Sequence, residues 1–143
     1  MARQSTNVTK TNVFLPLRVA LGLIFIWAGG NKLWGLISGS EGTINFFASL
    51  GIPAPTFFAW LVGIVEFVGG IFLVIGFLIW WSSLLLAIIL AVATITNNLM
   101  ADPAQISQFL YHLAWIAGLV TLMMSKNTYK AVDATFGWKE VGK

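Results

Sequence analysis

The chain has 143 residues, 58% of them apolar, and carries only eight Lys or Arg and five Asp or Glu side chains. A typical soluble domain is about 45–50% apolar and about 25% charged. The mean hydropathy of +0.87 also shows a chain more apolar than a typical soluble domain. These figures exclude a water-soluble globular domain and indicate one domain whose main partner is the lipid bilayer.

Several kinds of chemistry are excluded by the residues that the chain lacks. It contains no cysteine, which excludes disulfides, thiolate nucleophiles and iron–sulfur clusters, and His112 is its only histidine. We therefore expect no metal site and no intrinsic redox cofactor. The net charge is only +3, and the cations gather near the two ends of the chain, so nucleic acid is not an expected partner.

Apolar stretches separated by short polar interruptions predict four membrane-spanning helices. Each stretch is long enough to cross about 30 Å of hydrocarbon as a helix. None shows the alternating pattern of barrel strands, so the expected fold is an all-α, four-helix transmembrane bundle. The predicted spans are residues 13–37, 56–79, 83–100 and 106–124.

Basic residues orient the predicted bundle. Seven of the eight lie before or at the start of the first span or after the fourth, and only Lys32 falls near the opposite face. This distribution predicts that both termini are cytoplasmic. The turn at residues 80–82 would then be cytoplasmic and the loop at 38–55 external. A cleaved signal peptide is the alternative for the first span, but no clear cleavage motif follows it.

Two segments outside the spans have features of their own. In the outer loop, residues 43–50 form an apolar pattern that predicts a short helix on the membrane interface. The prolines at 53 and 55 then precede the second span, because proline is tolerated in the first turn of a helix. The tail at 125–143 is mildly amphipathic and is expected to rest on the cytoplasmic lipid surface.

Glu66 is the most informative residue, because an ionisable side chain at the centre of a membrane helix costs at least about 2.5 kcal/mol. At about 100° per residue, it shares a face of the second span with Ala59, Gly63 and Gly70. Small residues allow close helix packing. We therefore expect this face to pack against a neighbouring helix and not against lipid.

The first span carries a comparable stripe. Arg18, Gly22, Phe25, Gly29 and Lys32 all lie in nearly one direction on the helix. Its two charged residues thus face the same way at opposite ends of the span, with Arg18 at the cytoplasmic end.

Depth along the spans predicts a polar pocket that opens to the outside. Glu66 would form its floor, and Lys32, Asn98 and His112 its walls. Trp115 is deep enough to line a pocket for a flat ring. We predict Glu66, Lys32 and His112 as catalytic residues; the predicted cofactor-binding residues are Arg18, Asn98 and Trp115.

Structural roles are the alternative for the same residues. Glu66 would then be a buried carboxylate that Lys32 or Arg18 neutralises, or a protonated acid that holds the first two spans together. Both basic side chains are long enough to extend to the headgroups instead. His112 would be a hydrogen-bonded packing residue.

Four segments of the sequence resemble the DoxX/DoxD family of small four-span bacterial and archaeal membrane proteins. They read LRVALGLIF at 17–25, AGGNKL at 28–33, LGIP at 50–53 and VEFVGGIFLVIGF at 65–77. The family usually has a basic residue after the last of these, where this chain has Ile79-Trp80-Trp81. That departure puts a lipid or partner contact at the turn in doubt.

The resemblance implies a redox-associated protein of the cell membrane. Its DoxD branch is similar to a subunit of thiosulfate:quinone oxidoreductase, and other members are accessory subunits. Our first hypothesis is therefore a quinone-linked redox subunit, in which Glu66 with Lys32 or His112 handles protons. The second is a scaffold for other membrane subunits or a second copy of the chain. The third is a small proton-coupled transporter.

Overall fold

The computed structural model describes residues 14–96 and 106–125, and within these ranges the chain is helical apart from short turns. The prediction of an all-α fold is confirmed. Asn98, the end of the third predicted span and the tail after residue 125 lie outside the described residues. The helices are α1 (Leu15–Ile37), α2 (Gly42–Ser49), α3 (Pro55–Ile75), α4 (Ile79–Ile95) and α5 (Ile106–Met124).

Three of the helices, α1, α3 and α5, are long and apolar enough to cross a membrane. The fourth apolar helix, α4, has 17 described residues, which at 1.5 Å per residue extend about 25 Å. The described part of the chain is thus a helical membrane bundle, as its composition predicts.

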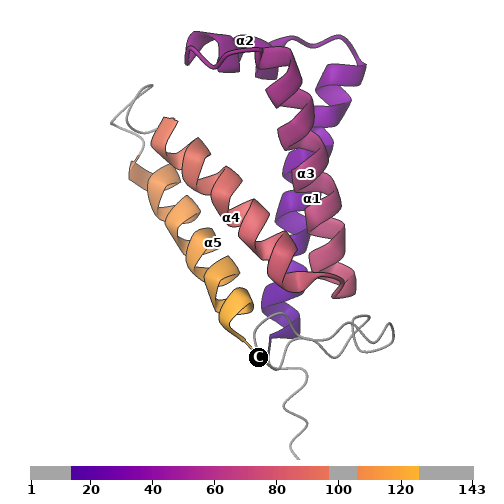
Figure 1. Ribbon diagram of the computed structural model, residues 1–143, viewed down its shortest axis with the longest axis vertical. Helices are drawn as coiled ribbons and strands as arrows, with labels where there is room; N and C mark the ends of the chain where they lie inside the picture. Colours follow the sequence, from indigo (N-terminus) through magenta and orange to yellow (C-terminus); the bar gives the residue numbers. More distant parts are fainter. Residues whose placement is uncertain (1–13, 97–105, 126–143) are drawn as a thin grey trace, which may run out of the picture.

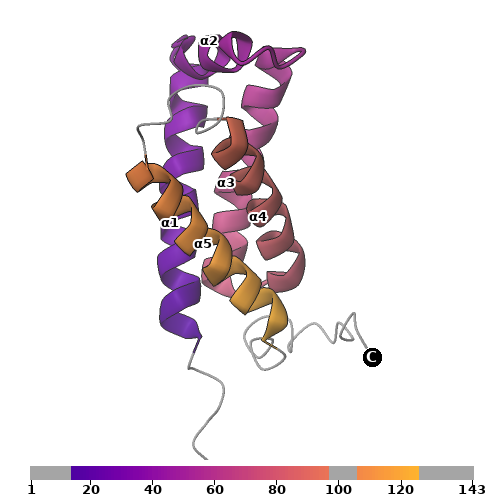
Figure 2. The ribbon, with the colours of Figure 1, turned by 90° about the vertical axis from the view of Figure 1, so that its left-hand side faces the viewer.

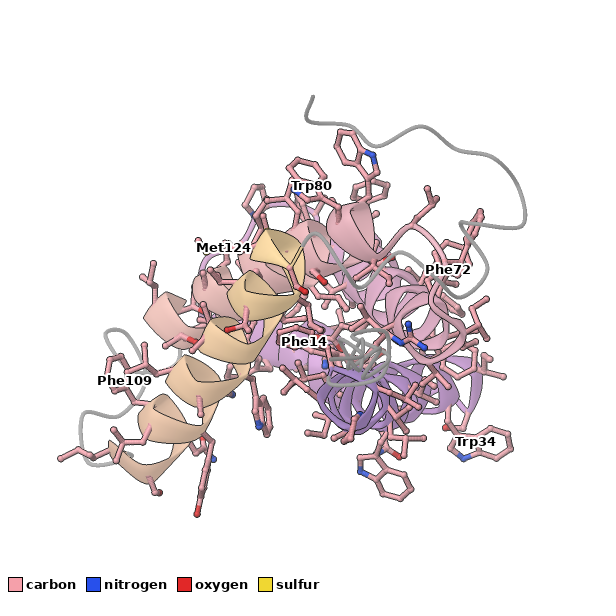
Figure 3. All side chains as sticks on the ribbon, turned by 90° about the horizontal axis from the view of Figure 1, so that it is seen from below. Phe14, Trp34, Phe72, Trp80, Phe109 and Met124 are labelled. Atoms are coloured by element: carbon pink, nitrogen blue, oxygen red, sulfur yellow. The ribbon has the colours of Figure 1, made fainter. Side chains whose placement is uncertain are left out.

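The long helices run back and forth between two ends of the bundle (Figure 1). The short helix α2 lies across one end, which we call the α2 end, and Figure 2 shows the same arrangement from the side. The start of α1 and the end of α5 lie at the other end, which we call the terminal end. Viewed from there, Phe14 and Met124 both face the reader (Figure 3).

The turn between α3 and α4 differs from the sequence prediction. It lies at residues 76–78, where Gly76 has φ +78° and its N–H donates to the Phe72 carbonyl at 2.9 Å. A left-handed glycine at this position is a common helix end. The prediction of a turn at residues 80–82 was wrong, because Gly76 is followed directly by apolar residues that continue the hydropathy of the span. Trp80 and Trp81 belong to the first turn of α4.

The short helix in the outer loop is confirmed: α2 is Gly42–Ser49, against the predicted 43–50. It is followed by a turn in which Gly51 has φ +71°. Pro55 then occupies the first turn of α3, as predicted.

Helices α1 and α3 approach so closely that their backbones are almost in contact. A Cβ atom added to Gly70 would lie 2.7 Å from the carbonyl oxygen of Gly22, and one added to Gly22 would lie 2.7 Å from the carbonyl oxygen of Gly70. Nearer the α2 end, a Cβ added to Gly29 would lie 2.8 Å from the carbonyl oxygen of Gly63, so the two backbones approach closely there as well. The small-residue faces predicted for the first two spans therefore pack against each other.

The apolar core lies in the terminal half of the bundle. Helices α4 and α5 pack on each other, join α1 and α3 there, and lean away from them toward the α2 end (Figure 1). Consistent with this arrangement, every residue from 106 to 111 at the start of α5 is exposed. The core residues are Leu21, Phe25, Leu73, Ile79, Leu86, Leu90, Leu119 and Leu122.

Candidate functional site

An ion pair joins α1 to α3 in the half of the bundle nearer the α2 end. The ammonium of Lys32 donates to Oε2 of Glu66 at 2.5 Å. The Glu66 side chain is only 8% exposed, whereas that of Lys32 is 28% exposed. Of the two neutralising partners that the sequence allows for Glu66, the structure thus pairs it with Lys32.

The geometry of two antiparallel helices explains why these side chains meet. The Cβ of Lys32 is level with Gly63, one helical turn from Glu66. Because Cα–Cβ bonds tilt toward the N-terminus of their own helix, Lys32 leans toward the terminal end and Glu66 toward the α2 end. The two side chains therefore converge. The lysine extends into the bundle and not outward to the headgroups.

A second polar pair joins α4 to α5. Oγ1 of Thr94 lies 3.1 Å from Nδ1 of His112, and the same hydroxyl donates to the Leu90 carbonyl at 2.6 Å. Thr94 is buried and His112 is half-buried. Thr94 was not among the predicted site residues, although it precedes the predicted Asn98 by four residues, a spacing that puts two side chains on one face of a helix. A polar side chain on the buried face of an apolar helix is the signal that could have identified it.

Trp115 packs beside this second pair. Its ring centroid lies 5.6 Å from that of His112 at an interplanar angle of 45°, and it also packs against the apolar core. Two other tryptophans of the spans lie elsewhere: Trp27 is 74% exposed and Trp60 is also exposed, as expected of side chains that face lipid.

Both pairs belong to one cluster. Lys32 lies close enough to His112 for its charge to act on the imidazole. Each of the four long helices contributes one member, and all four members lie beyond the apolar core toward the α2 end. We call Lys32, Glu66, Thr94 and His112 the polar cluster.

The structure does not bring every predicted site residue into this cluster. Arg18 is buried near the start of α1, and the 14 residues between it and Lys32 correspond to about 21 Å along the helix. It therefore lies near the terminal end, apart from the polar cluster. The predicted Asn98 falls in the segment that the structure does not describe.

The polar cluster has the groups needed to hold and exchange protons. It combines an ammonium donor, a carboxylate acceptor and an imidazole that can do both. In residues 14–96 and 106–125, no three His, Cys, Asp or Glu side chains gather as metal ligands would. The arrangement can orient a polar ring and move protons at its edge, but it carries no electrons itself.

The fold and the cluster define a multi-helix integral membrane protein with a buried ion pair between its two most tightly packed helices. Comparison of the sequence with known families gives the family: the DoxX model matches residues 13–99. The chain belongs to the DoxX family, as the resemblance of its segments at 17–25, 28–33, 50–53 and 65–77 implied. Both Lys32 and Glu66 fall within the matched region.

Two curated relatives are similar over most of their length. "Putative oxidoreductase CatD" of Bacillus subtilis is 33% identical over 119 residues, which cover 83% of this chain and 83% of the relative. "Inner membrane protein YqjF" of Escherichia coli is 31% identical over 113 residues, 79% of this chain and 72% of the relative. No solved structure matches the chain. The likenesses support membrane localisation.

Proposed function

We propose that this DoxX protein is a quinone-binding subunit of a membrane oxidoreductase complex of the thiosulfate:quinone type, with the polar cluster as its site. The observation that carries the proposal is the Lys32–Glu66 ion pair between two apolar helices, with His112 within electrostatic reach of Lys32. Intramembrane charges are costly and usually functional. The similarity to a relative named as an oxidoreductase supports redox chemistry over other uses of the site.

The residues of the cluster suit a quinone ring. Lys32 has ammonium protons to donate to a ring carbonyl, while Glu66 and His112 hold protons that the ring exchanges. Trp115 offers a flat aromatic surface beside His112. A bound quinone supplies the two-electron chemistry that the chain lacks, since it has no cysteine and a single histidine. The electrons must therefore come from a partner subunit or a soluble donor.

The charge distribution of the sequence gives the proposed orientation. Cations concentrated at the two chain ends favour a cytoplasmic terminal end and an external α2 end, in a bacterial or archaeal cell membrane. The polar cluster then lies in the outer half of the bilayer. Its quinone would then enter from the lipid of the outer half of the bilayer.

Replacement of Glu66 tests this function. We expect Glu66→Gln, in protein purified in mild detergent, to fold normally and to lose at least about tenfold in affinity for decylubiquinone or menadione, as loss of a charged hydrogen-bond partner predicts. Glu41→Gln is the matched control, because Glu41 is an exposed acid just before α2. Equal binding by Glu66→Gln and wild type would contradict the proposal.

A specific observation also favours a second function, that of an accessory scaffold. The ion pair lies within the α1–α3 contact, on the α2 side of the close approach at Gly29, so it can serve to hold these helices together. The exposed apolar start of α5 would then contact other subunits or a second copy. Loss of the folded protein in Glu66→Gln, with no quinone bound by wild type, would support this scaffold function.

A further inference from the structure

The hydrogen bonds of Thr94 determine which nitrogen of His112 carries a proton. A threonine hydroxyl has one proton to donate. That proton is used in the 2.6 Å bond to the Leu90 carbonyl. The 3.1 Å contact with His112 therefore requires Nδ1 to be the donor and the threonine oxygen to be the acceptor.

This assignment leaves the other ring nitrogen as an acceptor. In a neutral imidazole only one nitrogen is protonated, so Nε2 presents a lone pair. Among residues 14–96 and 106–125, no group hydrogen-bonds with Nε2. The threonine is well suited to fixing the ring, because it is buried, branched at Cβ and tied to its own helix.

We propose that Thr94 is a positioning residue that holds His112 with Nε2 as a hydrogen-bond acceptor, so that the site binds the hydroxyl group of a reduced, quinol-type ring. The ligand part of this inference rests on the proposed function. An acceptor nitrogen binds a hydroxyl but not a carbonyl, whereas the Lys32 ammonium binds a carbonyl. The cluster thus has the Lys32 ammonium to bind the carbonyl of an oxidised ring and Nε2 of His112 to bind the hydroxyl of a reduced ring.

The role of Thr94 can be tested without any ligand. His112 is the only histidine of the chain, so ¹⁵N NMR of histidine-labelled protein shows one imidazole and needs no assignment. At a pH where the ring is neutral, we expect wild type and Thr94→Ser to show the Nδ1–H tautomer and Thr94→Val to shift toward Nε2–H. Thr121→Val is the control, because Thr121 makes the same bond to its own helix, to Ala117, but contacts no histidine.

The ligand arm compares the oxidised and reduced forms of one probe. Under anaerobic conditions, we expect Thr94→Val to weaken decylubiquinol binding by roughly three- to tenfold and to leave decylubiquinone binding unchanged, with recovery in Thr94→Ser.

The two arms separate the possible failures. An Nε2–H tautomer in wild type, or an unchanged spectrum in Thr94→Val, would overturn the positioning role. Equal loss of both ligands in Thr94→Val would overturn the selectivity for a hydroxyl. If neither ligand bound wild type, the proposed function and the ligand part would both fail, while the NMR result would still decide the role of Thr94.

Discussion

The ion pair between Lys32 and Glu66 stabilises the bundle only while both side chains are present. Removal of one partner leaves the other without a compensating charge. Without Lys32, the Glu66 carboxylate, which is 8% exposed in the intact pair, would have no partner among the described residues. Breaking a fully buried pair costs about 3–5 kcal/mol, whereas replacing both partners with apolar residues is often neutral. The partial exposure of Lys32 makes the expected cost smaller than that range.

We therefore predict that Lys32→Met destabilises the protein by about 2 kcal/mol, and that the double variant Lys32→Met, Glu66→Leu recovers most of the loss. Reversible unfolding in mixed detergent micelles, followed by circular dichroism, measures each free energy. A double variant whose loss equals the sum of the two single losses would show that the pair is not coupled.

The members of this cluster were only partly predictable from sequence. Glu66 and Lys32 stood out because ionisable residues are rare in membrane helices, and helical periodicity placed each on the correct buried face. Periodicity does not give the rotation and depth of one helix against another. For that reason the choice between Lys32 and Arg18 as partner of Glu66 stayed open, and the contact between Thr94 and His112 was not foreseen.

At the scale of the helices, the close α1–α3 contact depends on glycines at particular positions. A Cβ on Gly29 would collide with the backbone nitrogen of Phe67 and lie 2.8 Å from the carbonyl oxygen of Gly63. These are backbone atoms, so they cannot move aside without separating the helices. At the adjacent Gly30, an added Cβ would meet only the Phe67 ring, at 3.7 Å, which is ordinary van der Waals contact.

We predict that Gly29→Ala destabilises the protein by about 1–3 kcal/mol, as expected for overpacking of a tight contact. Gly30→Ala, its matched control one residue away, should cause no loss, since alanine is the better helix former. Thermal unfolding of the purified variants in one detergent measures both. Equal stability of the two variants would mean that α1 and α3 do not approach as closely as the structure indicates.

The sequence predicts some of the helix boundaries correctly, but it does not reveal the end of α3. Pro55 marked the start of α3, and the polar residues before α2 marked the outer loop. The end of α3 was concealed, because Gly76 is followed by Phe77 and Leu78, which continue the apolar run. In a membrane protein, turns near the bilayer surface can remain apolar, so a turn that depends on a left-handed glycine is poorly marked by hydropathy.

At the scale of the whole molecule, the bundle consists of two helix pairs with different packing. The α1–α3 pair is held by backbone contact at glycines, and the α4–α5 pair joins it through side chains in the terminal half, where Gly118 lies against Leu21. Toward the α2 end the pairs lean apart, and there the polar cluster replaces the apolar core (Figure 1). The apolar core thus stabilises the terminal half of the bundle, and the polar cluster lies in the half nearer the α2 end.

The same arrangement predicts the topology in the membrane. The loop before α2 and the end of α5 lie at opposite ends of the bundle, and the cations of the chain ends predict that the terminal end is cytoplasmic. Since the natural chain has no cysteine, single variants can be labelled without background. In intact cells lacking an outer membrane, we expect a membrane-impermeant maleimide to label Ser40→Cys at once and Ser125→Cys only after the cells are permeabilised. The reverse pattern would invert the bundle and move the polar cluster to the cytoplasmic half of the bilayer, so the electron donor would have to be sought inside the cell.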